Sequence, residues 1–231
     1  MNVEVIAGKS GDLSIPTIFL HGFPGIRSKQ NREIAQGFVN SGGGDAHVLL
    51  YSGLTQAPGQ FTFTSCLAEV HAYLEKLVTP KSQSFNLVGH SWGGFLSLTI
   101  AERFQPFLRK MVLMSPLLYF WEESESTKFF EETLKNNPGI QIGTASERGA
   151  EFETFGTSTP PDRLIRSVTP ETEVLFLQAR EDDVTPTSIA LEKVKLFEKF
   201  PTFELVDTDH SFILNRERIT KRISNFLATG I

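Results

Sequence analysis

The stretch Phe85-Asn86-Leu87-Val88-Gly89-His90-Ser91-Trp92-Gly93-Gly94 decides the fold of this chain. Its short apolar run ends in the pattern G-x-S-x-G, and a helical pattern over 95–104 follows at once. This order predicts a sharp turn between a strand and a helix, with Ser91 at its apex in a strained backbone conformation. Gly89 and Gly93 omit the side chains that would collide across so tight a bend. Strain of this kind costs roughly 1–3 kcal/mol, so we expect it where it positions a functional group, here the Ser91 hydroxyl.

Because G-x-S-x-G also occurs by chance, the rest of the chain decides how the motif is interpreted. Apolar runs typical of strands alternate with amphipathic helical patterns. Strands are predicted at 3–6, 15–20, 46–51, 85–90, 110–114, 173–178 and 203–206, and helices at 31–40, 64–78, 95–104, 189–200 and near the C-terminus. Since the strands are apolar throughout, this alternation predicts an α/β fold whose central sheet is mostly parallel, with helices on both faces. We expect residues 1–231 to form one domain.

The segment 117–168 interrupts this alternation, because it contains no clean strand. We expect it to be a small cap-like insertion that packs over the top of the sheet. Its glutamates are typical of a solvated helix face. Its aromatic side chains have two interpretations, core packing or a substrate wall. We favour the wall, because an insertion has little core of its own, and we predict a substrate pocket that includes Tyr119, Phe129 and Phe155.

The composition excludes several classes of function. The net charge is −5 and no basic stripe is present, which argues against a nucleic-acid partner. The longest apolar stretch, 111–121, is shorter than the ~20 residues of a membrane span. No secretory signal is visible, and the single cysteine, Cys66, fits a reducing compartment, so we expect a cytoplasmic protein. No cluster of His, Cys and carboxylate residues has metal-ligand spacing, and we predict no metal site.

Three residue types that cooperate in nucleophilic catalysis follow strands of the predicted sheet. Ser91 lies at the turn, Asp182 and Asp183 follow one strand, and His210 follows the last. The carboxyl ends of parallel strands meet at one edge of the sheet, where ligands bind. A serine hydroxyl needs an imidazole to take its proton, and the imidazole needs a carboxylate to fix its tautomer. Neighbouring side chains in an extended loop point to opposite sides, so only one of the two aspartates can face His210.

In these motifs the chain resembles the α/β-hydrolase superfamily of serine hydrolases, from about Ile15 to the C-terminus. The matching segments are the turn at 89–94, His21-Gly22-Phe23-Pro24-Gly25, Asp182-Asp183-Val184-Thr185-Pro186 and His210. The segment 21–24 is also similar to one in epoxide hydrolases, but those use an aspartate at the position of Ser91. The segments 21–31, 51–53 and 57–59 resemble small relatives of serine peptidases and esterases.

The resemblance implies the α/β-hydrolase fold, no cofactor and a role for each site residue. Ser91 would be the nucleophile, His210 the base and Asp182 its partner, because the superfamily acid stands four residues before the proline and Pro186 is so placed. The backbone N–H groups of Phe23 and Trp92 would form the oxyanion hole. His21 would brace its own loop.

We therefore expect a serine hydrolase that cleaves an ester, thioester or amide of a small, partly apolar acyl substrate through an acyl-enzyme. A carboxylesterase is the leading prediction. An aminopeptidase-like enzyme, a carbon–carbon bond hydrolase, an acyltransferase and a non-catalytic binding module on the same fold remain alternatives. Sequence alone leaves the substrate and the oligomeric state open.

Overall fold

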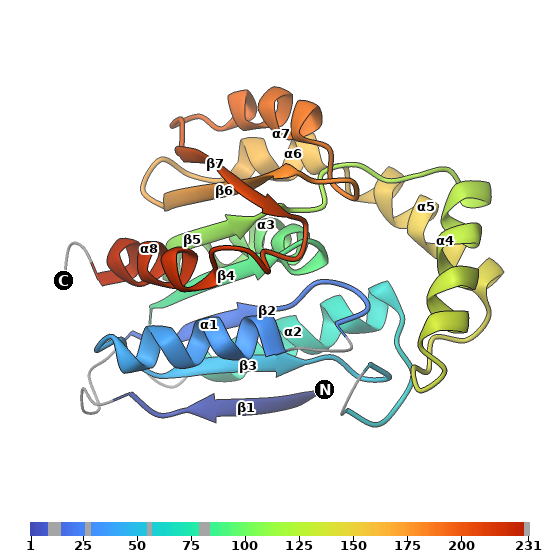
Figure 1. Cartoon of the computed structure of the whole chain (residues 1–231), viewed down its shortest axis with the longest axis horizontal. Helices are drawn as coiled ribbons and strands as arrows, with labels where there is room; N and C mark the ends of the chain where they lie inside the picture. The colour runs from blue at the N-terminus through green and yellow to red at the C-terminus, as the bar shows by residue number, and fades with distance from the viewer. Residues whose placement is uncertain (9–14, 26–28, 55–56, 79–83, 229–231) are drawn as a thin grey trace.

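The strands of the described residues form one seven-stranded sheet (Figure 1). The computed structural model describes residues 1–8, 15–25, 29–54, 57–78 and 84–228. The described strands lie in the order β1-β3-β2-β4-β5-β6-β7. They are β1 (Asn2–Ile6), β2 (Thr17–Leu20), β3 (Ala46–Leu50), β4 (Phe85–His90), β5 (Leu108–Met114), β6 (Glu173–Glu181) and β7 (Thr202–Asp209). Only β1, at one edge, is antiparallel to its neighbour, so the predicted mostly parallel sheet is confirmed for the described strands.

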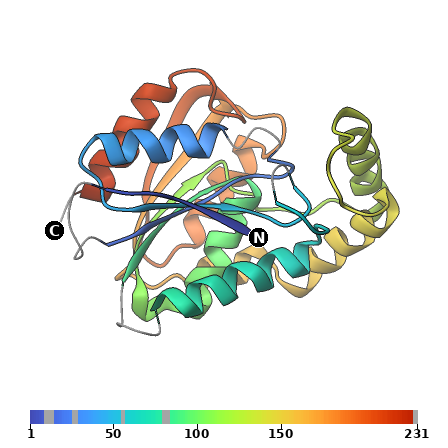
Figure 2. The same cartoon turned by 90° about the horizontal axis from the view of Figure 1, so that it is seen from below.

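Helices cover both faces of the sheet, as predicted (Figures 1 and 2). Helices α1 (Lys29–Asn40) and α8 (Arg216–Ala228) pack against each other on one face. The other face carries α2 (Phe63–Val78), α3 (Trp92–Phe104), α6 (Pro161–Ser167) and α7 (Thr187–Lys193), with the 3₁₀ turns η1 (Gln105–Phe107) and η2 (Val194–Leu196). Among the described helices, none is both long and apolar enough to cross a membrane.

Two apolar clusters, one on each face, hold the helices to the sheet. Successive side chains of a strand point to opposite faces, so each buried strand contributes side chains to both clusters. In β5, Met111 and Leu113 join the cluster under α2 and α3, whereas Val112 and Met114 join the cluster under α1 and α8. This two-sided burial explains why the strands are apolar at every position rather than at alternate ones.

The segment 117–168 contains α4 (Glu123–Asn136), α5 (Ala145–Ser158) and α6. Helices α4 and α5 pack side by side beyond the carboxyl ends of the parallel strands (Figure 1). The expectation that this segment has little core is wrong, because Phe130 and Phe152 are buried in the same apolar cluster as α2 and α3. Buried side chains of the segment therefore belong to the core of the sheet.

Several predicted boundaries also differ from the structure, and two of them bear on the site or on the end of a helix. The helix predicted over 189–200 ends at Lys193, and one 3₁₀ turn, η2, follows it. Pro201 disfavours the helical conformation in the residue before it, and Phe200 is exposed. Strand β6 continues to Glu181, three residues beyond the prediction, so that Asp182 comes directly after it.

Candidate active site

Ser91 lies at the sharp turn between β4 and α3. Its backbone adopts φ 53° and ψ −117°, a conformation that non-glycine residues rarely take. The Ser91 N–H donates to the carbonyl of Met114 at 3.0 Å, and the Ser91 carbonyl accepts from Leu117 N–H at 3.0 Å. The last residue of β5 and the segment just after it therefore hold the serine backbone by its N–H and its carbonyl. The strained turn predicted from G-x-S-x-G is present.

A side chain at either glycine of the motif would collide with neighbouring atoms, as predicted. A Cβ atom at Gly89 would lie 2.3 Å from the carbonyl oxygen of Gly93 and from Oγ of Ser97. A Cβ atom at Gly93 would lie 2.1 Å from the carbonyl oxygen of Leu20, which belongs to β2. Helix α3 therefore begins against the backbone of β2, and any side chain at Gly93 would push the helix away from the sheet.

Asp182 and His210 form the central polar contact of the site. Nδ1 of His210 lies 2.9 Å from both carboxylate oxygens of Asp182. An ionised carboxylate can only accept, so Nδ1 carries the proton and Nε2 keeps its lone pair. An imidazole in this tautomer can take a proton from a hydroxyl at Nε2. Asp183 is exposed and belongs to no described hydrogen bond.

The loop after β6 holds the Asp182 carboxylate in its charged form. The side chain is completely buried, and it accepts hydrogen bonds from Val184 N–H at 3.0 Å, Thr185 N–H at 2.6 Å and Thr185 Oγ1 at 2.8 Å. Burial by itself raises the pKa of Asp182, but the hydrogen bonds and the charge of His210 outweigh it and lower the pKa to about 2. The carboxylate is therefore ionised throughout the neutral range.

His90 links the Ser91 turn to His210. Its Nε2 donates to the backbone carbonyl of His210 at 2.8 Å, and the two imidazole centroids are 4.9 Å apart. Burial and the neighbouring His210 lower the pKa of His90 to about 3, so its ring is neutral at physiological pH. In the described part of the chain the Ser91 hydroxyl has no hydrogen-bond partner. No sequence pattern indicates this role of His90, because only the folded chain brings residues 90 and 210 together.

The two predicted oxyanion donors belong to the turn at Ser91 and to a loop that contacts this turn. Trp92 is the first residue of α3, and Phe23 lies in the loop after β2. Neither backbone N–H has a partner among the described residues. A Cβ atom at Gly22, next to Phe23, would lie 3.0 Å from Cβ of Ser91, so this loop contacts the turn directly. Two N–H groups of this kind can hold a negative oxygen.

His21 braces its own loop, as expected. Its Nδ1 lies 2.7 Å from the carbonyl oxygen of Gly22, and its ring packs on Tyr51 with centroids 4.1 Å apart. Cys66 is buried and accepts a hydrogen bond from Trp92 Nε1 at 3.5 Å, which fits a packing role. No group of three or more His, Cys, Asp or Glu side chains that could hold a metal ion occurs within the described residues.

The three predicted pocket residues have different surroundings. Tyr119 is half-buried and accepts from Trp121 Nε1 at 2.6 Å. Phe129 is half-buried and lies 6.2 Å from the ring of Phe23. Phe155 is buried, 5.6 Å from the ring of Trp92. The cavity of about 470 Å³ beside His210 is lined by other residues, so a role of these three in substrate binding stays a prediction.

Comparisons with known proteins point in one direction. Residues 16–152 match the family described as alpha/beta hydrolase fold. Comparison with curated protein sequences gives no significant match. Among solved structures, an esterase from Exiguobacterium antarcticum is similar with a TM-score of 0.77 at 15% identity, covering 97% of this chain and 94% of that one. Est1E from Butyrivibrio proteoclasticus with ferulic acid bound has a TM-score of 0.73 at 15% identity, covering 98% and 93%. A monoacylglycerol lipase from Paleococcus ferrophilus has a TM-score of 0.71 at 14% identity, covering 98% of both chains.

Proposed function

This chain belongs to the alpha/beta hydrolase fold family, and from that premise we propose that it is a serine hydrolase acting on an ester of a small, partly apolar acyl group. Thioesters and amides are chemically accessible to the same site. The similarity to an esterase, to a monoacylglycerol lipase and to a structure holding ferulic acid supports hydrolysis of a small acyl compound. A cytoplasmic location remains part of this proposal.

In the proposed reaction, Ser91 Oγ attacks the carbonyl carbon while Nε2 of His210 takes the hydroxyl proton. The carbonyl oxygen becomes negative and accepts hydrogen bonds from the N–H groups of Phe23 and Trp92. Each such donor typically stabilises the transition state by ~3–4 kcal/mol. The C–O bond then breaks, and the leaving oxygen takes the proton from His210. Water, activated by the same imidazole, releases the acid and restores Ser91.

One observation carries the proposal: the buried, ionised Asp182 carboxylate bonded to Nδ1 of His210 at 2.9 Å. A free-energy cost accompanies the burial of a carboxylate, and here hydrogen bonds from Val184, Thr185, His210 and Gln178 offset it. Such an arrangement orients the imidazole and stabilises its protonated form during the reaction.

The apolar acyl group would lie on the aromatic side of Phe23. The Phe23 ring lies 5.2 Å from Phe61, 5.5 Å from Phe130 and 6.2 Å from Phe129. Rings from the loop after β2 and from α4 therefore meet beside the proposed oxyanion donor, and this surface suits an alkyl or aromatic acyl chain.

A fluorophosphonate probe tests the proposal, since Ser91 Oγ would displace fluoride and keep the phosphonyl group. We expect the wild-type protein to be labelled and Ser91→Ala to be unlabelled. Ser188→Ala, which removes an exposed serine on α7, should label like the wild type. A p-nitrophenyl ester series, with aminoacyl anilides beside it, then separates esterase from peptidase. Well-folded wild-type protein that neither labels nor hydrolyses any ester would favour the binding module.

A further inference from the structure

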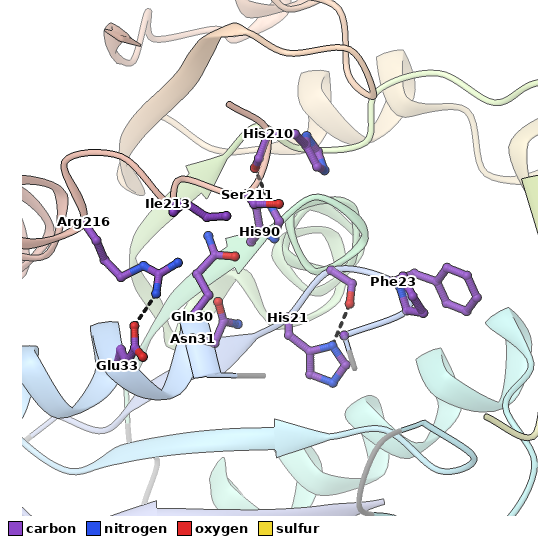
Figure 3. Close-up of a pocket in the computed structure, with 13 residues that line it drawn as sticks. His21, Phe23, Gln30, Asn31, Glu33, His90, His210, Ser211, Ile213 and Arg216 are labelled. Carbon is purple, nitrogen blue, oxygen red and sulfur yellow. Dashed lines mark hydrogen bonds and ion pairs between the residues drawn. The ribbon is translucent and has the colours of Figure 1, made fainter. Parts of the chain in front are cut away.

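A cavity of about 470 Å³ lies beside His210, on the side of α1 (Figure 3). Gln30 and Asn31 at the start of α1 form one wall, the loop with His21 another, and His90 with His210 a third. The space is many times the ~30 Å³ that one water molecule occupies in the liquid, and it falls in the range of small-molecule sites. A ligand of several non-hydrogen atoms fits it.

The walls of this cavity contain buried polar atoms that have no partner. Asn31 is 1% exposed, and neither its amide nitrogen nor its amide oxygen has a hydrogen-bond partner among the described residues. Nε2 of His21 and Nε2 of Gln30 are buried as well, and neither has a partner in the part of the chain that the structure describes. Buried polar atoms are nearly always hydrogen-bonded, so unpaired ones around a cavity indicate a missing ligand or water.

A ligand that pairs all of these atoms must both donate and accept hydrogen bonds. Asn31 presents a donor and an acceptor whichever way its amide is turned. Nδ1 of His21 donates to the Gly22 carbonyl, so its Nε2 can only accept, whereas Nε2 of Gln30 can only donate. A carboxylate or phosphate only accepts and an ammonium only donates. A hydroxyl group does both.

Among the described residues that line the cavity, no charge is left unbalanced. Arg216 and Glu33 at its rim are joined in an ion pair (Figure 3). His21 and His90 are neutral, since burial lowers their pKa values to about 4 and about 3. A neutral ligand therefore matches this cavity better than an ion does.

We propose that this cavity binds the alcohol half of the substrate, and that this alcohol is a neutral polyol with at least two hydroxyl groups, such as a glycerol or sugar moiety. The inference rests on the proposed function. When the C–O bond breaks, the alcohol oxygen takes the proton of His210, and His210 is one of the residues that line this cavity, so the proposal places the leaving group here. The acyl group then lies on the aromatic side of Phe23.

The test compares esters that share one acyl group: propyl butanoate, glycerol monobutanoate, a glucose butanoate and p-nitrophenyl butanoate. For the wild type we expect kcat/KM of a polyol ester to exceed that of the propyl ester at least tenfold. The glycerol and glucose esters show which polyol is preferred. Asn31→Leu, which removes both polar atoms at similar volume, should lower the polyol-ester value about tenfold or more and change the p-nitrophenyl value less than threefold.

Gln36→Leu is the matched control, because Gln36 is exposed on the same helix away from the cavity. It should leave the ratio of polyol ester to propyl ester unchanged. If Asn31→Leu does not fold, the wild type alone decides: free glycerol should capture the acyl-enzyme at least fivefold better than propanol, measured as ester formed relative to acid.

Equal kcat/KM for the propyl and polyol esters, with Ser91-dependent hydrolysis of p-nitrophenyl butanoate, would overturn this inference and leave the proposed function standing. An unchanged ratio in folded Asn31→Leu would mean that the amide meets only water, which also overturns it. Loss of all esterase activity and of fluorophosphonate labelling would remove the proposed function, and the inference with it.

Discussion

Both carboxylate oxygens of Asp182 lie 2.9 Å from Nδ1 of His210, and the Asp182 side chain has no exposed surface. Asp182 and His210, which are 28 positions apart in the sequence, are therefore joined by one N–H hydrogen bond at the carboxyl end of the sheet. This contact distinguishes Asp182 from its exposed neighbour Asp183.

Asp182→Asn should lower kcat about 10⁴-fold, because the amide NH₂ cannot hold the imidazole in the required tautomer. It should also destabilise the protein by about 1–3 kcal/mol, since the new NH₂ would face N–H and O–H donors of the loop. Asp183→Asn should keep kcat within tenfold. Steady-state kinetics and urea unfolding of the two variants check this. The reverse pattern would assign the acid to Asp183.

His90 should act as a positioning residue for His210. His90→Leu removes the N–H that holds the His210 carbonyl at 2.8 Å, and kcat should fall roughly tenfold with KM little changed. His90→Gln retains a donor and should recover part of the loss. The values of kcat and KM for the two variants separate this role from general destabilisation. General destabilisation would lower the activity of both variants in proportion to their loss of unfolding free energy.

The free energy of unfolding should decrease between pH 6.5 and pH 5. His21 and His90 have pKa values lowered by burial to about 4 and about 3 in the folded protein, against ~6.5 in the unfolded chain. In this window the unfolded chain binds protons that the folded protein does not, so stability is complete above pH ~6.5 and is lost as the pH falls. Each histidine contributes ~1.4 kcal/mol per pH unit, or about 2 kcal/mol by pH 5.

Urea unfolding at pH 7, 6 and 5 measures this effect. The unfolding free energy of His90→Gln should change less steeply with pH, because one proton fewer is taken up on unfolding. Asp182 does not contribute in this window, because its lowered pKa affects stability only as the pH falls from ~4 toward 2. Identical slopes in the wild type and in His90→Gln would contradict the assignment.

Ser91→Gly should be more stable than Ser91→Ala by about 1–3 kcal/mol, although both lack the hydroxyl. At φ 53° an alanine keeps the backbone strain and a glycine relieves it. Urea unfolding of the pair measures the strain stored at the turn. Equal stabilities would show that the turn carries no strain beyond that of an ordinary residue.

Phe129→Ala and Phe155→Ala should differ. Phe155 is buried against Trp92, so its truncation should cost about 3–5 kcal/mol of stability. Phe129 is half-buried beside Phe23, so its truncation should change the chain-length preference toward p-nitrophenyl esters more than the melting temperature. If both variants keep the wild-type ester preference, neither ring contacts the acyl group.

The sequence by itself determined the turn at Ser91 and the layers of the fold. A G-x-S-x-G pattern between an apolar run and a helix has one compact solution, because only glycine fits where α3 meets β2. Apolar strands that alternate with helices require a sheet covered on both faces. These are local or repeating constraints, so the sequence carries them directly.

The tertiary structure alone decided which residues from distant segments contact one another at the site. His90 contacts the His210 carbonyl, and Asn31 is buried against the same cavity, although the sequence marks neither residue. The aromatic rings of α4 and α5 joined the main core, against expectation, because these helices pack on the same apolar cluster as α2 and α3. Such contacts depend on how separate elements pack, and packing between distant segments leaves no periodic pattern in the sequence.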